Sequence, residues 1–225
     1  MTTIVFASSK GGVGKSTSCL TLAQELAHRG KTVSILDADP NAGLVEWSEE
    51  AQHDRITVHG NITDNSIIEL IIDESERVPF VLVDLEGTKN LKMSSAIARA
   101  DLVVVPMKGS HLDARRASDT IKIIRVQERH MDRKIPFGVL FTQAPAAMVT
   151  KDERAAREEL ERAGIPVFVT RMVDRSAYRA IFSYASTLRD LPQNEVRSVP
   201  TAIENAEAFT DEVIERLRAE RSVAA

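Results

Sequence analysis

The chain has 225 residues, of which 43% are hydrophobic, and its formal net charge is -4 at pH 7. This length and composition can bury one sizeable core, so we expect a single domain over residues 1–225. The small negative charge does not indicate a nucleic-acid-binding protein. A single cysteine excludes an intramolecular disulfide, which fits a reducing cytoplasm, and the five histidines have no metal-ligand spacing. No stretch approaches the length of an uncharged apolar membrane span, and no signal segment is expected before the first strand.

Short apolar runs alternate with helical patterns along the chain. Strands are predicted at 3–8, 31–37, 55–60 (the weakest), 78–84, 101–107, 136–142 and 165–170. Helices are predicted at 15–30, 43–51, 64–76, 91–100, 112–131, 151–164, 175–186 and 200–220. Gly30 is expected to end the first helix, and Asp64 or Asn65 to cap the third. This alternation predicts an α/β fold of the P-loop NTPase type, with a mostly parallel twisted sheet and helices on both faces.

The first strand leads into residues 9–16, SKGGVGKS, which we call the phosphate loop. It matches the pattern G-x-x-x-x-G-K-[ST], except that Ser9 stands in place of the first glycine. A turn followed by a helix from Lys15 would direct backbone N–H groups and the positive end of the helix dipole at an anion. Lys15 would reach the β- and γ-phosphates, and the Ser16 hydroxyl would bind Mg²⁺. The nucleotide-binding residues predicted here are Gly11, Gly12, Val13, Gly14, Lys15, Ser16 and Thr17.

A second lysine, Lys10, lies inside the turn, five residues before Lys15. A single-subunit phosphate loop does not need it, because Lys15 already supplies a cation to the terminal phosphates. The stretch K-G-G-V-G-K-S-T resembles the deviant Walker A box of the ParA/MinD family of ATPases. In that family the early lysine crosses the interface of an ATP-sandwich dimer and contacts the partner's phosphates. The resemblance therefore implies a catalytic role for Lys10 and Lys15 and a homodimer formed with ATP.

Two further motifs support the resemblance. The segment D-A-D-P-N after the second strand is similar to the family's D-x-D-P-Q, which implies that Asp39 positions the attacking water and that Asp37 orders the site. The apolar strand ending in Asp84 resembles a Walker B box, whose carboxylate holds Mg²⁺, usually through water. Gly87 occupies the D-x-x-G switch position, where a backbone N–H can sense the γ-phosphate. Glu86 is either a base or, as we favour, a solvated carboxylate.

The remaining segments favour the small plasmid-type ParA branch. We expect no N-terminal helix-turn-helix of the kind found in larger ParA proteins, because the first predicted strand begins close to Met1. The last predicted helix is acidic on its polar side, so we expect it to dock on its own domain and not on a membrane. Trp47 is interpreted as a packing residue. By position, the residues expected around the adenine base are Thr142, Gln143, Met172 and Val173.

Two basic stretches could bind DNA. Lys122 and Arg129 are seven residues apart on one predicted helix and therefore share a face with Arg115. Arg171, Arg175 and Arg179 resemble the family's DNA-contacting C-terminal region. A solvated helix face is the alternative for both stretches, and dimerisation would double either patch.

The sequence thus predicts a cytoplasmic, nucleoid-associated ATPase with ATP and Mg²⁺ as ligands. By resemblance, its dimer would bind nonspecific DNA, and a centromere-binding ParB-type adaptor would stimulate slow hydrolysis during plasmid partition. The alternatives are a ParA-type ATPase that positions a protein cargo, a microcompartment or a conjugation complex, and a metabolic P-loop enzyme. Lys10 and the aspartate pair count against the last.

Overall fold

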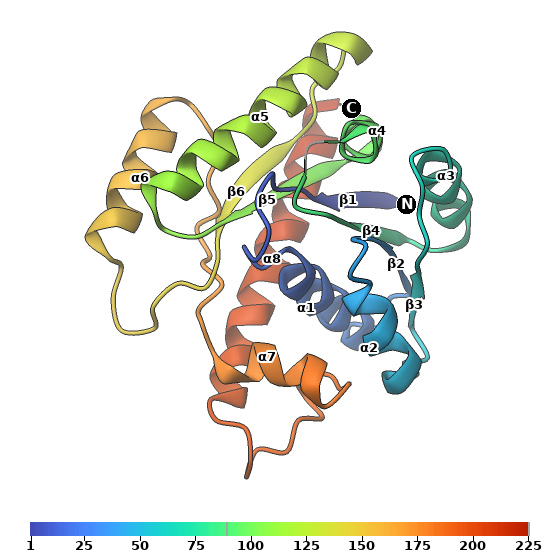
Figure 1. Ribbon diagram of the computed structural model, residues 1–225, viewed down its shortest axis with the longest axis vertical. Coiled ribbons are helices and arrows are strands. Elements are labelled where there is room, and N and C mark those ends of the chain that lie inside the picture. The colour runs from blue at the N-terminus through green and yellow to red at the C-terminus, as the bar shows by residue number, and fades with distance from the viewer. Residues whose placement is uncertain (89, 225) are drawn as a thin grey trace.

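The protein folds around a six-stranded sheet in which every strand pairing is parallel (Figure 1). The computed structural model describes residues 1–88 and 90–224. The strand order is β3-β2-β4-β1-β5-β6, so the first strand lies inside the sheet. The strands are β1 (Thr2–Phe6), β2 (Val33–Ala38), β3 (Ile56–His59), β4 (Phe80–Leu85), β5 (Leu102–Met107) and β6 (Phe137–Phe141).

Helices join these strands and cover both faces of the sheet. They are α1 (Lys15–His28), α2 (Gly43–Ala51), α3 (Ile67–Arg77), α4 (Leu91–Arg99), α5 (His111–Met131), α6 (Lys151–Arg162), α7 (Ser176–Ser183) and α8 (Val199–Ala224). The predicted α/β class with a parallel sheet is confirmed. None of the described helices combines the length and apolar character needed to cross a bilayer.

The two faces are separated by the alternation of side chains along each strand. On β1, Ile4 and Phe6 join the core formed with α1, α2, α7 and α8, whereas Val5 joins the core formed with α3 to α6. All three side chains are fully buried. Parallel strands buried on both faces are mostly apolar, and this is why the strands are rich in Val, Ile, Leu and Phe.

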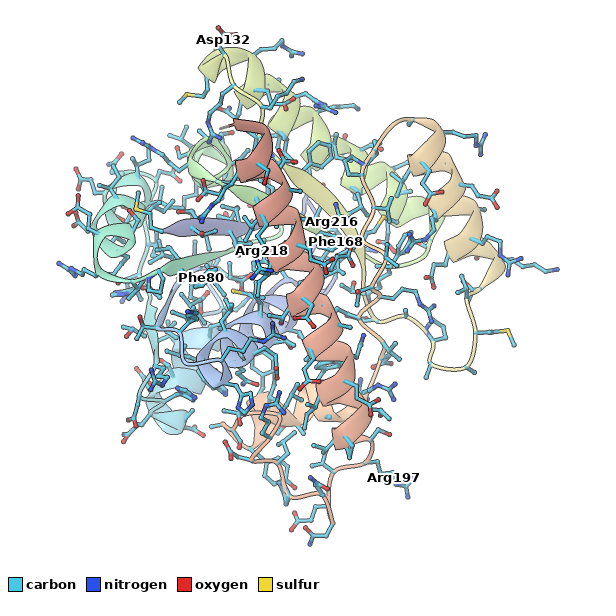
Figure 2. All side chains as sticks on the ribbon, turned by 180° about the vertical axis from the view of Figure 1, so that it is seen from behind. Phe80, Asp132, Phe168, Arg197, Arg216 and Arg218 are labelled. Atoms are coloured by element: carbon cyan, nitrogen blue, oxygen red, sulfur yellow. The ribbon has the colours of Figure 1, made fainter. Side chains whose placement is uncertain are left out.

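The long helix α8 crosses the back of the molecule (Figure 2). Phe209 and Val213 are at most 1% exposed and Leu217 is also buried, so the predicted docking of this helix on its own domain is confirmed. Trp47 is a packing residue as predicted: it is 2% exposed, and its indole N–H donates to the carbonyl of Ser186 at 3.2 Å.

The predicted strand at 165–170 is wrong; only an isolated bridge joins Val139 and Val167. The segment forms strand-like backbone bonds with β6 only around Val139, and helix α8 binds several of its other backbone groups. Glu212 accepts the N–H groups of Val169 and Thr170, both at 2.8 Å, and Arg216 donates to the Val167 carbonyl at 2.7 Å. Figure 2 shows Arg216 beside Phe168, with its guanidinium 4.1 Å from the ring centroid.

The predicted cap of α3 is also wrong. The N-cap position belongs to Ser66, and neither Asp64 nor Asn65 caps this helix. Asp64 instead accepts the backbone N–H of Lys92, in the first turn of α4, at 3.1 Å. Its carboxylate therefore binds an N–H group in the first turn of a different helix, which is a contact that local sequence cannot reveal.

Candidate nucleotide-binding site

The carboxyl ends of β1, β2 and β4 bring the predicted motifs together. Because these strands are adjacent and parallel, the phosphate loop, the Asp37–Asp39 segment and the β4–α4 loop (between Leu85 and Leu91) emerge at one edge of the sheet. In register, Asp84 of β4 pairs with Phe6 of β1 on one side and with Asp37 of β2 on the other. This is the usual place for a ligand in an open parallel sheet.

The phosphate loop has the geometry of an anion-binding turn. Gly12 and Gly14 have φ of +68° and +84°, which side chains rarely adopt, and Gly14 is the N-cap of α1. No side chain caps this helix start, so the N–H groups of its first turn are available to phosphate oxygens.

Lys15 is the buried cation of the site. It is 5% exposed, and its ammonium lies 3.4 Å from the carbonyl of Lys10. Burial lowers the pKa of Lys15, and the carboxylates of Asp84, Asp39 and Glu86 offset part of that shift. A dry ammonium next to an anion-binding turn is suited to charge-assisted bonds with terminal phosphates.

Asp84 fits a metal site. It is fully buried, and neither carboxylate oxygen has a hydrogen-bond partner of good geometry among the described residues. Burial raises the pKa of Asp84 to about 7, while the nearby Ser16 hydroxyl and the Lys15 ammonium act to lower it. A buried carboxylate with unused oxygens beside a hydroxyl is a donor set that Mg²⁺ accepts, directly or through water.

Asp37 and Asp39 have different surroundings. Asp37 is 2% exposed and accepts backbone N–H groups from Asp39, Leu44 and Val45 at 2.9 to 3.2 Å. Burial raises the pKa of Asp37, and these backbone bonds partly reverse the shift. It therefore orders the start of α2. Asp39 is half-buried, and one of its oxygens accepts the backbone and side-chain N–H groups of Asn41, both at 2.9 Å, so its second oxygen is left for a ligand.

Gly87 lies directly against the phosphate loop. A Cβ atom at this position would be 2.5 Å from the Gly11 nitrogen. Only glycine permits this approach, so the β4–α4 loop and the phosphate loop are in backbone contact at the position predicted for the switch glycine.

Ser9 and Lys10 attach the phosphate loop to α5. The Ser9 N–H donates to the Thr120 hydroxyl at 3.1 Å, and its own hydroxyl donates to the Arg116 carbonyl at 3.0 Å. Lys10 forms an ion pair with Asp113, which is 3% exposed. Asp113 is not among the residues predicted from sequence; the only local signal is its place three residues after Ser110, the N-cap of α5.

The residues predicted around the base gather at one cavity of about 180 Å³. Thr142, Met172 and Val173 line it together with Gly14 and Thr17. The Thr142 hydroxyl lies 2.6 Å from the Val13 carbonyl, and the Gln143 amide donates to the Gly12 carbonyl at 3.0 Å, so both also support the phosphate loop. The cavity has further walls that sequence reasoning missed or placed elsewhere: Ser18, Asp174, Arg175, Tyr178 and Arg179.

The predicted DNA-binding residues do not form one patch. Lys122 and Arg129 belong to α5, which ends at the top of Figure 1, whereas α7 lies at the bottom. Arg171 forms two bonds at 3.0 and 3.2 Å with the buried carboxylate of Glu153. Arg179 forms an ion pair with Asp174. The Lys122 side chain is 77% exposed, and its ammonium lies 3.5 Å from Asp119, three residues earlier on the same helix.

Comparisons with known proteins agree with this architecture. The VirC1 protein family model matches residues 1–217. Protein ParA of Rhizobium radiobacter is 36% identical over 218 residues, which is 96% of this chain and 98% of that protein. Protein virC1 of the same organism is 29% identical over 80% of each chain. The maintenance of carboxysome distribution protein A of Halothiobacillus neapolitanus is 28% identical over 79% of this chain and 82% of its own.

Solved structures share the fold at low sequence identity. Apo McdA from Cyanothece superposes with a TM-score of 0.76 at 17% identity, covering 95% of this chain and 99% of that one. A putative plasmid partition protein of Borrelia burgdorferi, solved with AMPPNP, gives 0.69 at 15% identity, with 96% and 99% covered. With the match over nearly the whole chain and the phosphate-loop geometry above, this protein belongs to the VirC1 family within the ParA/MinD group of ATPases.

Proposed function

We propose that this protein is a plasmid-partition ATPase that alternates between an ATP-bound, DNA-associated dimer and a released monomer. The observation that carries the proposal is the second lysine: Lys10 stands at the lip of a phosphate loop whose own terminal-phosphate cation, Lys15, is already in place. The 36% identity to a ParA protein over nearly the whole chain supports the partition role.

In this proposal the phosphate loop and Lys15 bind the ATP polyphosphate, and the cavity lined by Thr142, Met172 and Val173 takes the base. Ser16 and Asp84 would hold Mg²⁺, which supplies positive charge to the phosphate oxygens. Asp39 accepts a hydrogen bond from the attacking water and orients it for in-line attack on the γ-phosphate. Gly87, against Gly11, reports the presence of that phosphate to the β4–α4 loop.

Lys10 needs to change partners for the dimer to form. In this structure its ammonium is neutralised by Asp113 within the same chain. Two nucleotides facing each other across an interface repel, because each carries several negative charges, and one lysine from each subunit offsets that repulsion. We therefore expect Lys10 to leave Asp113 and to contact the nucleotide of the second subunit.

DNA binding and partner binding complete the proposal. A dimer presents two copies of each basic surface, and affinity for DNA grows with the number of phosphates neutralised together. A ParB-type centromere-binding adaptor would stimulate hydrolysis and release the dimer from DNA. This cycle would place the protein in the cytoplasm, on the nucleoid when it is bound to ATP.

Light scattering of wild type and Lys10→Ala tests the proposal. With a nonhydrolysable ATP analogue, wild type should dimerise, and Lys10→Ala should bind the analogue but remain monomeric. Both should be monomers with ADP. The same samples on nonspecific duplex DNA, over a range of salt concentrations, should show binding only for the wild-type ATP state. Lys31→Ala, which changes an exposed lysine in the loop after α1, is the matched control and should behave as wild type. Normal dimerisation of Lys10→Ala would contradict the proposal that Lys10 contacts the nucleotide of the second subunit.

A cargo-positioning ATPase is the second candidate. Its support is the 28% identity to a carboxysome distribution protein and the fold shared with McdA. A gene for a small basic DNA-binding protein immediately downstream would favour partition, whereas a shell or cargo protein there would favour this alternative.

A further inference from the structure

Lys92 makes two long-range contacts at the carboxyl edge of the sheet. Its ammonium donates to the carbonyl of Ala38, the last residue of β2, at 3.1 Å. Its backbone N–H donates to the Asp64 carboxylate, also at 3.1 Å. Lys92 is half-buried in the first turn of α4, the helix that begins directly after the β4–α4 loop.

The β4–α4 loop is thus held at both ends. At its beginning, Gly87 contacts the Gly11 backbone so closely that no side chain fits. At its end, Asn90 caps α4 by accepting the Met93 N–H at 2.9 Å, and Lys92 then reaches across to β2. A shift of this loop at the phosphate end would therefore be transmitted to the peptide that follows Ala38.

That peptide carries Asp39. The Asp39 carboxylate has one oxygen engaged by Asn41, so its direction depends on the backbone of the Ala38–Asn41 turn. Among the described hydrogen bonds, the Lys92 ammonium provides the side-chain contact to this turn from outside β2 and the loop that follows it. Catalytic orientation is sensitive to small displacements: about 1 Å can change a rate by about a hundredfold.

We propose that Lys92 is a positioning residue for Asp39, which couples the γ-phosphate-sensing loop to the carboxylate that orients water. The inference rests on the function proposed above for Asp39. It implies that Lys92 affects the hydrolysis step and leaves nucleotide binding alone, because its ammonium bonds to a backbone carbonyl and not to the phosphate loop. A purely structural role would instead lower stability, with any loss of turnover following from it.

The first test compares Lys92→Met, which keeps the aliphatic length but removes the charge and donor, with Lys92→Arg and with the exposed-site control Lys31→Met. Lys92→Met should lower the single-turnover hydrolysis rate by about tenfold, while the Kd of a fluorescent ATP analogue stays within error of wild type and the Tm falls only by the few degrees expected for one lost hydrogen bond. Lys92→Arg should recover most of the rate, and Lys31→Met should be unchanged. A wild-type rate for Lys92→Met, or a rate that Lys92→Arg does not recover, would overturn the inference.

The second test places Lys92→Met in an Asp39→Ala background. If Lys92 acts through Asp39, the double variant should hydrolyse ATP at the same slow rate as Asp39→Ala alone. Additive losses would show that Lys92 acts by another route and would reject the positioning role. The failure of the underlying function is distinguishable: it would appear as wild-type turnover in Asp39→Ala itself, whatever Lys92→Met does.

Discussion

Asp37 and Asp84 are register partners on neighbouring strands, yet their hydrogen bonding is opposite. Both are at most 2% exposed. Three backbone N–H groups bond to the Asp37 carboxylate, whereas no hydrogen-bond partner of good geometry reaches the Asp84 carboxylate among the described residues. Burial raises the pKa of both carboxyls, to about 7 for Asp84, while the three backbone donors act to lower the pKa of Asp37.

The difference distinguishes a residue whose hydrogen bonds hold the site in shape from a residue whose carboxylate oxygens are left for a ligand. A buried polar group with all its bonds made contributes to stability, and one left without bonds destabilises the free protein. Asp84 therefore reduces the stability of the nucleotide-free chain, and we attribute its presence to ligand binding. Asp37 has no such deficit, so we expect it to order the site rather than to bind the ligand itself.

The largest expected effect is that of Asp84→Asn on catalysis. Removing the ionised oxygen should lower Mg²⁺-dependent ATP turnover by about a hundredfold or more, because charge stabilisation of this kind supplies several kcal/mol. Turnover measured against Mg²⁺ concentration checks this expectation. If high Mg²⁺ fully restored turnover, the carboxylate would contribute to Mg²⁺ affinity only. Unchanged turnover would contradict the metal role.

The same variant should be more stable than wild type when no nucleotide is present. The folded pKa of about 7 lies above the ordinary 3.8, so between those pH values the folded chain binds more protons than the unfolded chain. The Asp84 contribution to wild-type stability consequently falls as pH rises from about 4 to about 7 and stays constant at higher pH. Asp84→Asn removes that fall, so its Tm should exceed that of wild type by a few degrees at pH 8 and by less at pH 5.

The opposite result is expected at Asp37. Asp37→Ala removes an acceptor from three backbone N–H groups at the start of α2 and should destabilise the protein by about 1–3 kcal/mol. Chemical denaturation without nucleotide measures this loss. Asp37→Asn, which keeps an acceptor oxygen, is the matched control and should lose less. Equal stability of wild type and Asp37→Ala would remove the distinction between the two aspartates.

Much of this site could be predicted from sequence because its residues act locally. The glycines of the phosphate loop, the positions of Asp37 and Asp84 one residue before the ends of β2 and β4, and the helix start at Lys15 all follow from neighbours within a few positions. Local pattern also predicts five of the six strands from strong apolar runs, together with the weaker β3, since strand interiors are apolar wherever the strand lies in the sheet.

The errors share a cause: each involves a partner far along the chain. The 165–170 segment is apolar enough for a strand, but it pairs with β6 only at Val139, and Glu212 and Arg216 of α8 bond to other backbone groups in it. Asp64 has the residue type and position to cap the helix nearest to it, yet it accepts an N–H group in the first turn of α4. Asp113 on α5, which pairs with Lys10 in this structure, is a contact that the sequence did not predict, for the same reason. Sequence distance hides such contacts because propensity and periodicity describe only neighbours.

The smallest expected effect extends the comparison to the arginines predicted to bind DNA. Arg171 resembles Asp37: its guanidinium is already used by Glu153, so it has little capacity left for a phosphate. Arg171→Ala should therefore change the affinity of the ATP-bound protein for nonspecific DNA by less than about twofold and leave the salt dependence unaltered. The substitution should instead lower Tm, since Glu153 is 1% exposed and would lose its cation.

Lys122→Ala is the contrasting variant, because this side chain is 77% exposed on α5. If α5 binds DNA through the Lys122 ammonium, this change should weaken binding across all sequences and reduce the slope of log affinity against log salt by about 1, with Tm unchanged. Fluorescence anisotropy on one duplex at several salt concentrations measures both variants. If Arg171→Ala lost DNA binding while keeping the wild-type Tm, Arg171 would exchange Glu153 for a phosphate in the dimer. The distinction between engaged and exposed basic side chains would then not hold for DNA binding.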